Sequence, residues 1–232
     1  MTPSLSVWLS TLPLEWIEGC DARAIDRARA AYETAGRHYH TWEHVVACVE
    51  RLKTFPSAQP RIVFLALVFH DAVYVPGRTD NEQASAELAC ETLTSLCAVT
   101  ASELDAVERM ILATRDHHAL SGTLSADEAV ILDLDLSVLG APREEYARYA
   151  TAIHDEYVPV AATEAQFRIG RTEFLRRMLA MPHIFLTAEG RRRWDEMARA
   201  NLAWEVAELA ARQGLIERWI SAIRRAMSVA VL

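Results

Sequence analysis

An uninterrupted apolar segment from Ile62 to Phe69 is followed directly by His70 and Asp71. Because every side chain of this segment is apolar, a helix formed by it would be hydrophobic on all sides and would belong in the protein interior. Two titratable groups at its end must then be hydrogen-bonded, ion-paired or bound to a metal ion, since burying them without partners is costly. The segment therefore predicts a central buried element and makes His70 and Asp71 candidates for a functional site.

A second His-Asp pair, His154-Asp155, occurs in a different setting. Its surroundings in the sequence are polar and include Arg148 and Glu156. Such a stretch is typical of a solvated helix face. We therefore expect the first pair, and not this one, to contribute to a functional site.

Charge and hydropathy exclude two classes of partner. The chain of 232 residues has a formal net charge of -8 and a pI of about 5.5, so it lacks the broad basic surface that binds a nucleic-acid backbone. No run approaches the roughly 18 apolar residues of a membrane span, and the first residues lack the basic start and long apolar centre of a signal peptide. We expect a cytoplasmic protein that binds neither a nucleic acid polymer nor a membrane, and the sequence leaves its oligomeric state open.

The four cysteines, Cys20, Cys48, Cys90 and Cys97, show no C-x-x-C spacing. Each lies in an apolar segment with helical character. This setting favours reduced thiols in the core over disulfides or a zinc site.

Helical spacing of apolar residues runs through nearly the whole chain, and Gly and Pro fall at the segment boundaries. The alternation from Leu132 to Val138 also suits a strand, but Ser125 before it and Gly140 after it favour a helix. We predict an all-α fold. The expected helices cover residues 22–33, 42–53, 61–73, 81–97, 101–115, 125–139, 143–158, 163–180, 188–212 and 215–228.

Three of these helices carry side chains that suit a metal ion. A hard or borderline divalent ion takes imidazole nitrogens and carboxylate oxygens from several helices, since one helix cannot surround it. His44 shares a helix face with Ala47 and Cys48, so its ring can point inward. It is then either a metal ligand or a core histidine bonded to a backbone carbonyl group.

The third helix offers two carboxylates, Asp133 and Asp135, and only one of them can bind the same ion. Residues two apart on a helix point about 200° from each other. Asp135 shares its face with the apolar Ile131 and Val138, whereas Asp133 lies on a smaller and more polar side. We therefore expect Asp135 to be the inward carboxylate.

Taken together, these residues resemble the HD superfamily of metal-dependent phosphohydrolases, and are closer to one bacterial subgroup of predicted HD phosphohydrolases. The likeness extends over residues 37–205. It implies a single all-helical HD-type domain, with a metal-site core at about 37–140 and a C-terminal helical extension at about 141–232. The stretches that carry the likeness are Tyr39-His40-Thr41-Trp42-Glu43-His44, Phe69-His70-Asp71-Ala72-Val73-Tyr74, Asp80-Asn81-Glu82, Ser85-Ala86, Leu132-Asp133-Leu134-Asp135-Leu136-Ser137-Val138-Leu139-Gly140, Glu156-Tyr157, Gly170-Arg171 and Ala198-Arg199-Ala200-Asn201-Leu202.

The resemblance also implies that His44, His70, Asp71 and Asp135 bind one divalent metal ion. Mn, Co, Ni, Mg, Zn and Fe are all compatible with such ligands. The ion would lower the pKa of a bound water and polarise a phosphoryl oxygen, so that the protein hydrolyses a small phosphate ester, of which a nucleotide is one example.

Hydrolysis also needs a general acid for the leaving group and donors for the phosphate oxygens. Asp80 or Glu82 could supply the acid, much as related members of the superfamily use a carboxylate shortly after the His-Asp pair. Asp80 could instead only cap its helix, and Glu82 could orient His44 or His70. His40 could line the mouth of the pocket.

Three further side chains are candidates for substrate binding. His117 and His118 lie at an expected helix end before a loop that contains Gly, where a histidine can either reach a cavity or be exposed. Arg171 could bind phosphate through two nitrogen atoms, or form a salt bridge to Glu156 or Asp155.

Two other functions compete with hydrolysis. Some HD proteins hold two irons and activate dioxygen, and they add two well-separated histidines between the His-Asp pair and the last Asp. This chain has only the adjacent His117 and His118 there, and Asp80-Asn81 where the first extra histidine is expected. A non-catalytic HD-like binding module is the third interpretation, and the complete set of four ligands argues against it.

Overall fold

The computed structural model describes residues 4–115 and 124–211 of the chain. In these two segments the elements are helices joined by turns and loops, without any strand. The prediction of an all-α fold is therefore confirmed. The last helix expected from the sequence, at 215–228, lies outside the described residues.

From residue 22 on, the observed helices follow the expected order, with ends that differ by a few residues. Two short helices before them, at Leu5–Leu9 and Leu14–Ile17, were not expected from the sequence. The stretch that also suited a strand is helical and becomes a 3-10 turn. None of the helices in the described segments is both long enough and apolar enough to cross a membrane. The bounds are α1 Leu5–Leu9, α2 Leu14–Ile17, α3 Ala22–Ala31, α4 Trp42–Leu52, α5 Pro60–Phe69, α6 Asn81–Leu96, α7 Ala101–Ala113, α8 Ala126–Asp135, the 3-10 turn Leu136–Gly140, α9 Arg143–Tyr157, α10 Glu164–Ala180 and α11 Ala188–Gly190, which continues through a π-helical turn Arg191–Asp195 into helix at 196–211.

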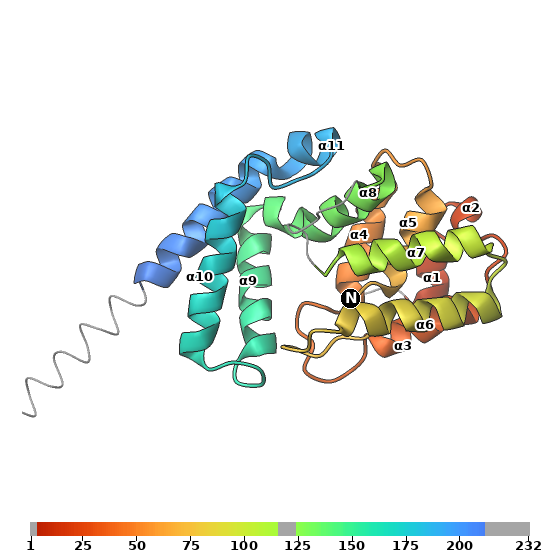
Figure 1. Ribbon diagram of the computed structural model, residues 1–232, viewed down its shortest axis with the longest axis horizontal. Coiled ribbons are helices and arrows are strands. Elements are labelled where there is room, and N and C mark those ends of the chain that lie inside the picture. The colour runs from red at the N-terminus through yellow and green to blue at the C-terminus, as the bar shows by residue number, and fades with distance from the viewer. Residues whose placement is uncertain (1–3, 116–123, 212–232) are drawn as a thin grey trace, which may run out of the picture.

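Helix α5 is the central element of the larger part of the fold, with α4, α7 and α8 packed against it (Figure 1). All of its side chains from Ile62 to Phe69 are buried, as the apolar run predicts. Pro60 occupies the first turn, where its missing N–H removes no intrahelical hydrogen bond. The buried element expected from the sequence is therefore present, and neighbours cover it on every side.

Helix α5 ends at Phe69, earlier than the sequence pattern suggested, and His70 is its C-terminal cap. The guanidinium group of Arg37 donates hydrogen bonds to the carbonyl oxygens of Asp71 and Ala72, at 2.7 and 2.8 Å. Because these carbonyl groups are bonded to a side chain, the backbone needs no further helical turn to satisfy them. His70 and Asp71 consequently sit at the end of a rigid, buried helix.

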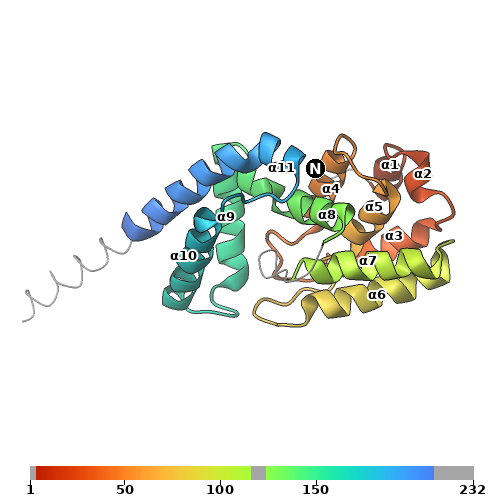
Figure 2. The same ribbon diagram turned by 45° about the horizontal axis from the view of Figure 1, so that its top comes forward.

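The hydrophobic core has two clusters of buried residues. The larger one includes Trp8 and Trp16 from the N-terminal helices, so it begins well before residue 37. The second contains Tyr146 of α9, Leu175 of α10 and Leu202 of the last described helix. In Figures 1 and 2, α9 and α10 lie side by side at one end of the molecule, while α6 and α7 lie at the other.

The expectation of four reduced thiols is wrong for two of the cysteines, since Cys20 and Cys97 form a disulfide. Neither lies inside a helix, because α2 ends before Cys20 and α6 ends before Cys97. Backbone hydrogen bonds on both sides hold the two chain segments together as antiparallel neighbours. Cys48 is a buried free thiol, as expected, and Cys90 is a half-buried one.

Candidate metal centre

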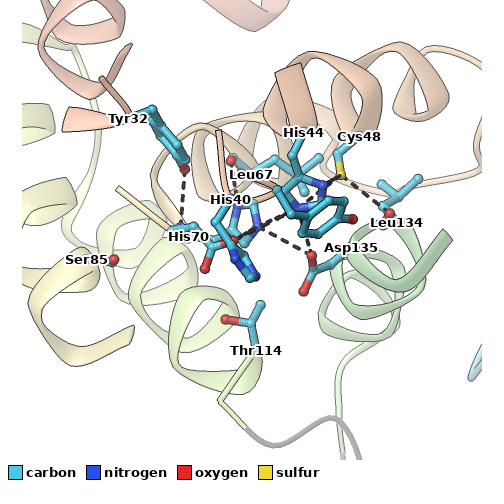
Figure 3. Close-up of polar contacts among 12 residues, drawn as sticks. Tyr32, His40, His44, Cys48, Leu67, His70, Ser85, Thr114, Leu134 and Asp135 are labelled. Carbon is cyan, nitrogen blue, oxygen red and sulfur yellow. Dashed lines mark hydrogen bonds and ion pairs between the residues drawn. The ribbon is translucent and has the colours of Figure 1, made fainter. Parts of the chain in front are cut away.

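Four side chains converge at the inner end of α5. His44 comes from α4, His70 and Asp71 follow α5, and Asp135 is the last residue of α8. Each offers one ligand atom, and these atoms all lie within 4.8 Å of one another. Figure 3 shows His44, His70 and Asp135 pointing into a common space. The four residues that the sequence singles out as metal ligands are thus brought together, and within the described segments no other such group converges.

The ring nitrogens and the carboxylates of this cluster face each other at short range. His44 Nε2 lies 3.2 Å from His70 Nε2 and 3.0 Å from Asp135 Oδ1. His70 Nε2 lies 3.0 Å from Asp71 Oδ2. Two imidazole nitrogens and two carboxylate oxygens therefore surround one point, which is a donor set that divalent metal ions bind.

A backbone carbonyl group fixes the orientation of His70. Its Nδ1 lies 2.8 Å from the carbonyl oxygen of Leu67, which can only accept a hydrogen bond. Nδ1 therefore carries a proton, and Nε2 is directed into the cluster. In known metal sites, histidine ligands are oriented in the same way, by a hydrogen bond from the ring nitrogen that does not bind the metal.

Burial and neighbouring charges shift the pKa values of these groups in different directions. Burial lowers the pKa of His44. Burial also acts to lower the pKa of His70, but the carboxylates of Asp71 and Asp135 outweigh this effect and raise it well above its ordinary value. Burial acts to raise the pKa of Asp71, but the imidazoles of His70 and His40 outweigh it and lower the pKa. Asp71 is therefore an anion at neutral pH, as a metal ligand must be.

Asp133 lies on a different face of α8 from Asp135 and is bound by the chain segment before α11. Its carboxylate accepts hydrogen bonds from the N–H groups of Leu186 and Thr187, at 2.6 and 2.9 Å, and from the Thr187 hydroxyl at 2.6 Å. Gly190 fits closely over it, because a Cβ added there would clash with Asp133 Oδ2. Asp133 is 1% exposed, so the side of α8 that looked more polar in sequence is covered by the segment before α11.

Glu156 anchors the segment that leads into α4. One carboxylate oxygen accepts hydrogen bonds from the consecutive N–H groups of His38, Tyr39 and His40, at 2.7 to 2.8 Å. The other lies 2.6 Å from His40 Nδ1. The sequence placed Glu156 on a solvated face, which is wrong because the residue is 1% exposed. A helical spacing of three from Ile153, which is also buried, was the available signal.

The charged forms of His40 and Glu156 are both favoured by their surroundings. Burial acts to raise the pKa of Glu156, but His40 and the backbone N–H groups outweigh it and lower the pKa. Burial acts to lower the pKa of His40, but Asp71 and Glu156 outweigh it and raise the pKa. The His40 ring stacks on Tyr74 at a centroid distance of 3.9 Å. His40 is therefore held rigidly beside the metal cluster.

A cavity of about 560 Å³ adjoins the cluster, and His40, Asp71 and Asp135 form part of its wall. Its size is typical of a small-molecule site. Thr114, just beyond α7, also lines it and lies below His40 and Asp135 in Figure 3. Residues of α9 and α10 line its far side.

The two candidate acids are placed differently. Glu82, in the first turn of α6, lines the cavity and lies 3.6 Å from Arg115. Asp80 is the N-cap residue of α6, but its side chain makes no capping hydrogen bond and instead pairs with Arg78 at the exposed surface. Asp80 is not among the residues that line the cavity.

Arg171 lines the same cavity but is already paired. Its guanidinium group donates to both carboxylate oxygens of Glu205, at 2.8 and 3.0 Å, and to the Tyr149 hydroxyl at 3.2 Å. The partner is therefore neither of the two acidic residues that the sequence suggested. His117 and His118 lie outside the described residues.

The second His-Asp pair lies at the surface, as expected. His154 Nδ1 is 2.9 Å from Asp155, and His154 Nε2 is 2.8 Å from Glu164. All three side chains are at least one third exposed, at 35%, 49% and 58%. The pair belongs to a network of side chains at the surface.

Comparison with known proteins adds no family assignment, since no protein-family model matches the chain and no curated protein is significantly similar to it. The likeness to the HD superfamily therefore rests on the quoted residues. The geometry of those residues provides the basis for a functional proposal.

Proposed function

We propose that this protein is an HD-type metal-dependent phosphohydrolase that acts on a small phosphate ester, of which a nucleotide is one example. One observation carries the proposal, namely the convergence of His44, His70, Asp71 and Asp135 within 4.8 Å at the end of a buried helix. Perturbed titratable groups gathered beside a cavity are typical of functional sites.

The donor set fits one divalent ion. Two imidazole nitrogens and two carboxylate oxygens are available, and the His70 ring is already oriented by the Leu67 carbonyl group. Mn, Co, Ni, Mg, Zn and Fe all accept such ligands, so the native metal must come from analysis of the protein. The bound ion would supply Lewis-acid activation of a water molecule and of a phosphoryl oxygen.

The other steps belong to side chains in the wall of the cavity. We assign the proton for the leaving group to Glu82, which lines the cavity, and not to Asp80, which faces Arg78 at the surface. Glu156 holds His40 through Nδ1, so that His40 Nε2 can donate a hydrogen bond to a phosphoryl oxygen. Arg171 is neutralised by Glu205, and its role is to shape the wall rather than to bind phosphate.

Cytoplasmic location remains part of the proposal. The Cys20–Cys97 disulfide argues against it, because disulfides are typical of oxidising compartments. Alkylation of free thiols at the moment of cell lysis distinguishes a reducing cytoplasm from an oxidising compartment. Full alkylation of both cysteines in cell extracts would agree with a reducing compartment.

Phosphate release tests the reaction. Purified protein with added Mn²⁺, Co²⁺ or Mg²⁺ is expected to release inorganic phosphate from phosphate monoesters without oxygen, and a chelator is expected to stop the release. Asp71→Ala should abolish it, whereas Asp155→Ala, at the exposed His-Asp pair, should retain it. The two variants remove the same chemical group, from a half-buried setting at Asp71 and from an exposed one at Asp155.

Two outcomes would replace this proposal. Two irons per chain with substrate-dependent oxygen uptake, and no phosphate release under anaerobic conditions, would establish the oxygenase. Tight ligand binding without turnover of any ester or any oxygen consumption would establish a binding module.

A further inference from the structure

We propose that the cavity beside the cluster selects phosphate monoesters whose organic group is aromatic and uncharged. The inference rests on the proposed function, because it takes the phosphate to be held at the cluster. It concerns which group is attached to that phosphate.

Two cavities lie near the cluster, and the larger one borders its two carboxylates. Asp71 and Asp135 both line the cavity of about 560 Å³. A smaller cavity of about 290 Å³ borders the cluster only through His44, whose Nε2 points away from it toward His70 and Asp135. A phosphate at the cluster would therefore have its organic group in the larger cavity.

Six tyrosine and phenylalanine side chains line this cavity and come from both of its sides. Tyr74 follows α5, whereas Tyr157 and Phe167 come from α9 and α10 and lie 6.1 Å apart between ring centroids. Aromatic side chains offer flat apolar faces on which another ring can stack or pack edge to face. The rings that line the cavity are Tyr39, Tyr74, Tyr149, Tyr157, Phe167 and Phe174.

The charges in the wall disfavour a substrate with several phosphates. Within the described residues, the only Lys or Arg side chains in the wall are Arg115 and Arg171. Arg115 lies 3.6 Å from Glu82, and Arg171 is bound by Glu205 through both of its oxygens. Each added phosphate brings negative charge that cationic donors stabilise. Among the described residues of this wall, Arg115 is left for that role, because Arg171 is already bound by Glu205. An uncharged organic group fits this wall better.

Gly170 on α10 leaves room for that group. No heavy atom lies within 4 Å of a Cβ added at this position, although the residue lines the cavity. A larger side chain at position 170 can therefore extend into the cavity without displacing a neighbour. This makes Gly170 the position at which the free space can be filled by mutation.

Benzyl phosphate and ethyl phosphate test the selection, because their leaving alcohols have similar acidity and their intrinsic reactivities are therefore close. We expect kcat/KM to be roughly ten- to a hundredfold higher for benzyl phosphate, which is the gain from burying one phenyl ring. Adenosine triphosphate should be a poorer substrate than benzyl phosphate. Equal rates for the two esters, or a preference for the triphosphate, would overturn the inference and leave the phosphohydrolase intact.

Filling the cavity should remove the preference. Gly170→Leu is expected to reduce the ratio of the benzyl to the ethyl kcat/KM at least several-fold, because the leucine occupies the space of the ring. Ala165→Leu is the matched control, since Ala165 is exposed on the same helix and does not line the cavity. A ratio that is unchanged in Gly170→Leu, or that falls equally in both variants, would contradict the assignment.

A binding measurement distinguishes failure of this inference from failure of the proposed function. Calorimetric titration with benzylphosphonate and ethylphosphonate, which cannot be hydrolysed, should show the same roughly ten- to hundredfold preference for the aromatic compound. If that preference is found but no ester is hydrolysed with any metal, the cavity assignment stands and the phosphohydrolase proposal fails. Equal binding of the two phosphonates, or no binding of either, would overturn the cavity assignment.

Discussion

The Nε2 atoms of His44 and His70 lie 3.2 Å apart, although the two rings reach this point from different helices. Because His70 Nδ1 is taken by the Leu67 carbonyl group, only Nε2 of that ring is available to the cluster. Two ring nitrogens at this distance repel each other unless a proton or a cation lies between them. With Asp71 adjacent, the arrangement is suited to hold a divalent cation.

His70→Ala is expected to remove the metal and hydrolysis together, because it deletes one ligand and leaves the remaining charges poorly compensated. Elemental analysis of protein purified without added metal measures the loss, from about one ion per chain to nearly none. His154→Ala removes an exposed histidine and serves as the control. Full metal occupancy in His70→Ala would show that the cluster is not the metal site.

Exchanging each of the two carboxylates of α8 should produce different defects. Asp135→Asn is expected to reduce metal content and activity. Asp133→Asn should keep the metal but lower the free energy of unfolding by about 1 to 3 kcal/mol, because the Asp133 carboxylate accepts three hydrogen bonds in the interior. Metal analysis and urea unfolding of both variants separate the two effects. Loss of metal in Asp133→Asn alone would mean that the other face of α8 serves the site.

Glu82→Gln is expected to reduce kcat by about 10² to 10⁴, which is the usual contribution of a general acid. Asp80→Asn should leave kcat close to the wild-type value, because Asp80 is exposed and paired with Arg78. Steady-state kinetics with benzyl phosphate compare the two variants, and metal content is measured in parallel. If the two substitutions have equal effects on kcat, Glu82 is not the proton donor.

Glu156→Gln should destabilise the protein most strongly in a defined pH window. The pKa of Glu156 in the folded protein is below its ordinary value of 4.5. Its ionised carboxylate therefore adds to the free energy of unfolding above pH 4.5, and this contribution is lost as the pH falls through the pKa of the folded state. The pKa of His40 in the folded protein is above its ordinary value of 6.5. Its protonated ring therefore adds to the free energy of unfolding below pH 6.5, and this contribution is lost as the pH rises through the pKa of the folded state. The loss of unfolding free energy in Glu156→Gln should therefore be largest between these values, at about 2 kcal/mol or more.

Urea unfolding from pH 4 to 9 measures this window. Glu164→Gln is the control, because Glu164 makes a similar contact with His154 at the exposed surface, where such a pair contributes little. A pH-independent difference between wild type and Glu156→Gln would show that the charge of Glu156 is not the source of its contribution.

Breaking the Cys20–Cys97 bond should lower the free energy of unfolding by about 2 to 4 kcal/mol, because the bond closes a loop across a sequence separation of 77 and restricts the unfolded chain. Denaturant unfolding with and without a reducing agent measures the effect. Cys90→Ser, at a free cysteine, should change little. Identical stability in oxidised and reduced protein would mean that the bond is absent in solution or without effect.

Much of the fold and part of the candidate site follow from patterns local in the sequence. Helical periodicity and cap residues placed most helices within a few residues, because burial of one helix face repeats along the chain itself. The apolar run before His70 identified the central helix for the same reason. The sequence predicted the ends of helices less accurately. Helix α5 ends at Phe69, where Arg37 donates a hydrogen bond to the carbonyl oxygen of Asp71, and a contact so distant in sequence leaves no local pattern.

The sequence by itself determined the all-α class, the buried position of α5 and the four residues that converge at its end, since each depends on local pattern or on the likeness of short motifs. Tertiary structure alone decided the partners of the other polar groups. Glu156 meets His40 across 116 positions, and Asp133 meets Leu186 across 53. Such pairs form only when packing brings distant helices together, and burial then makes an unpaired carboxylate too costly to leave in place.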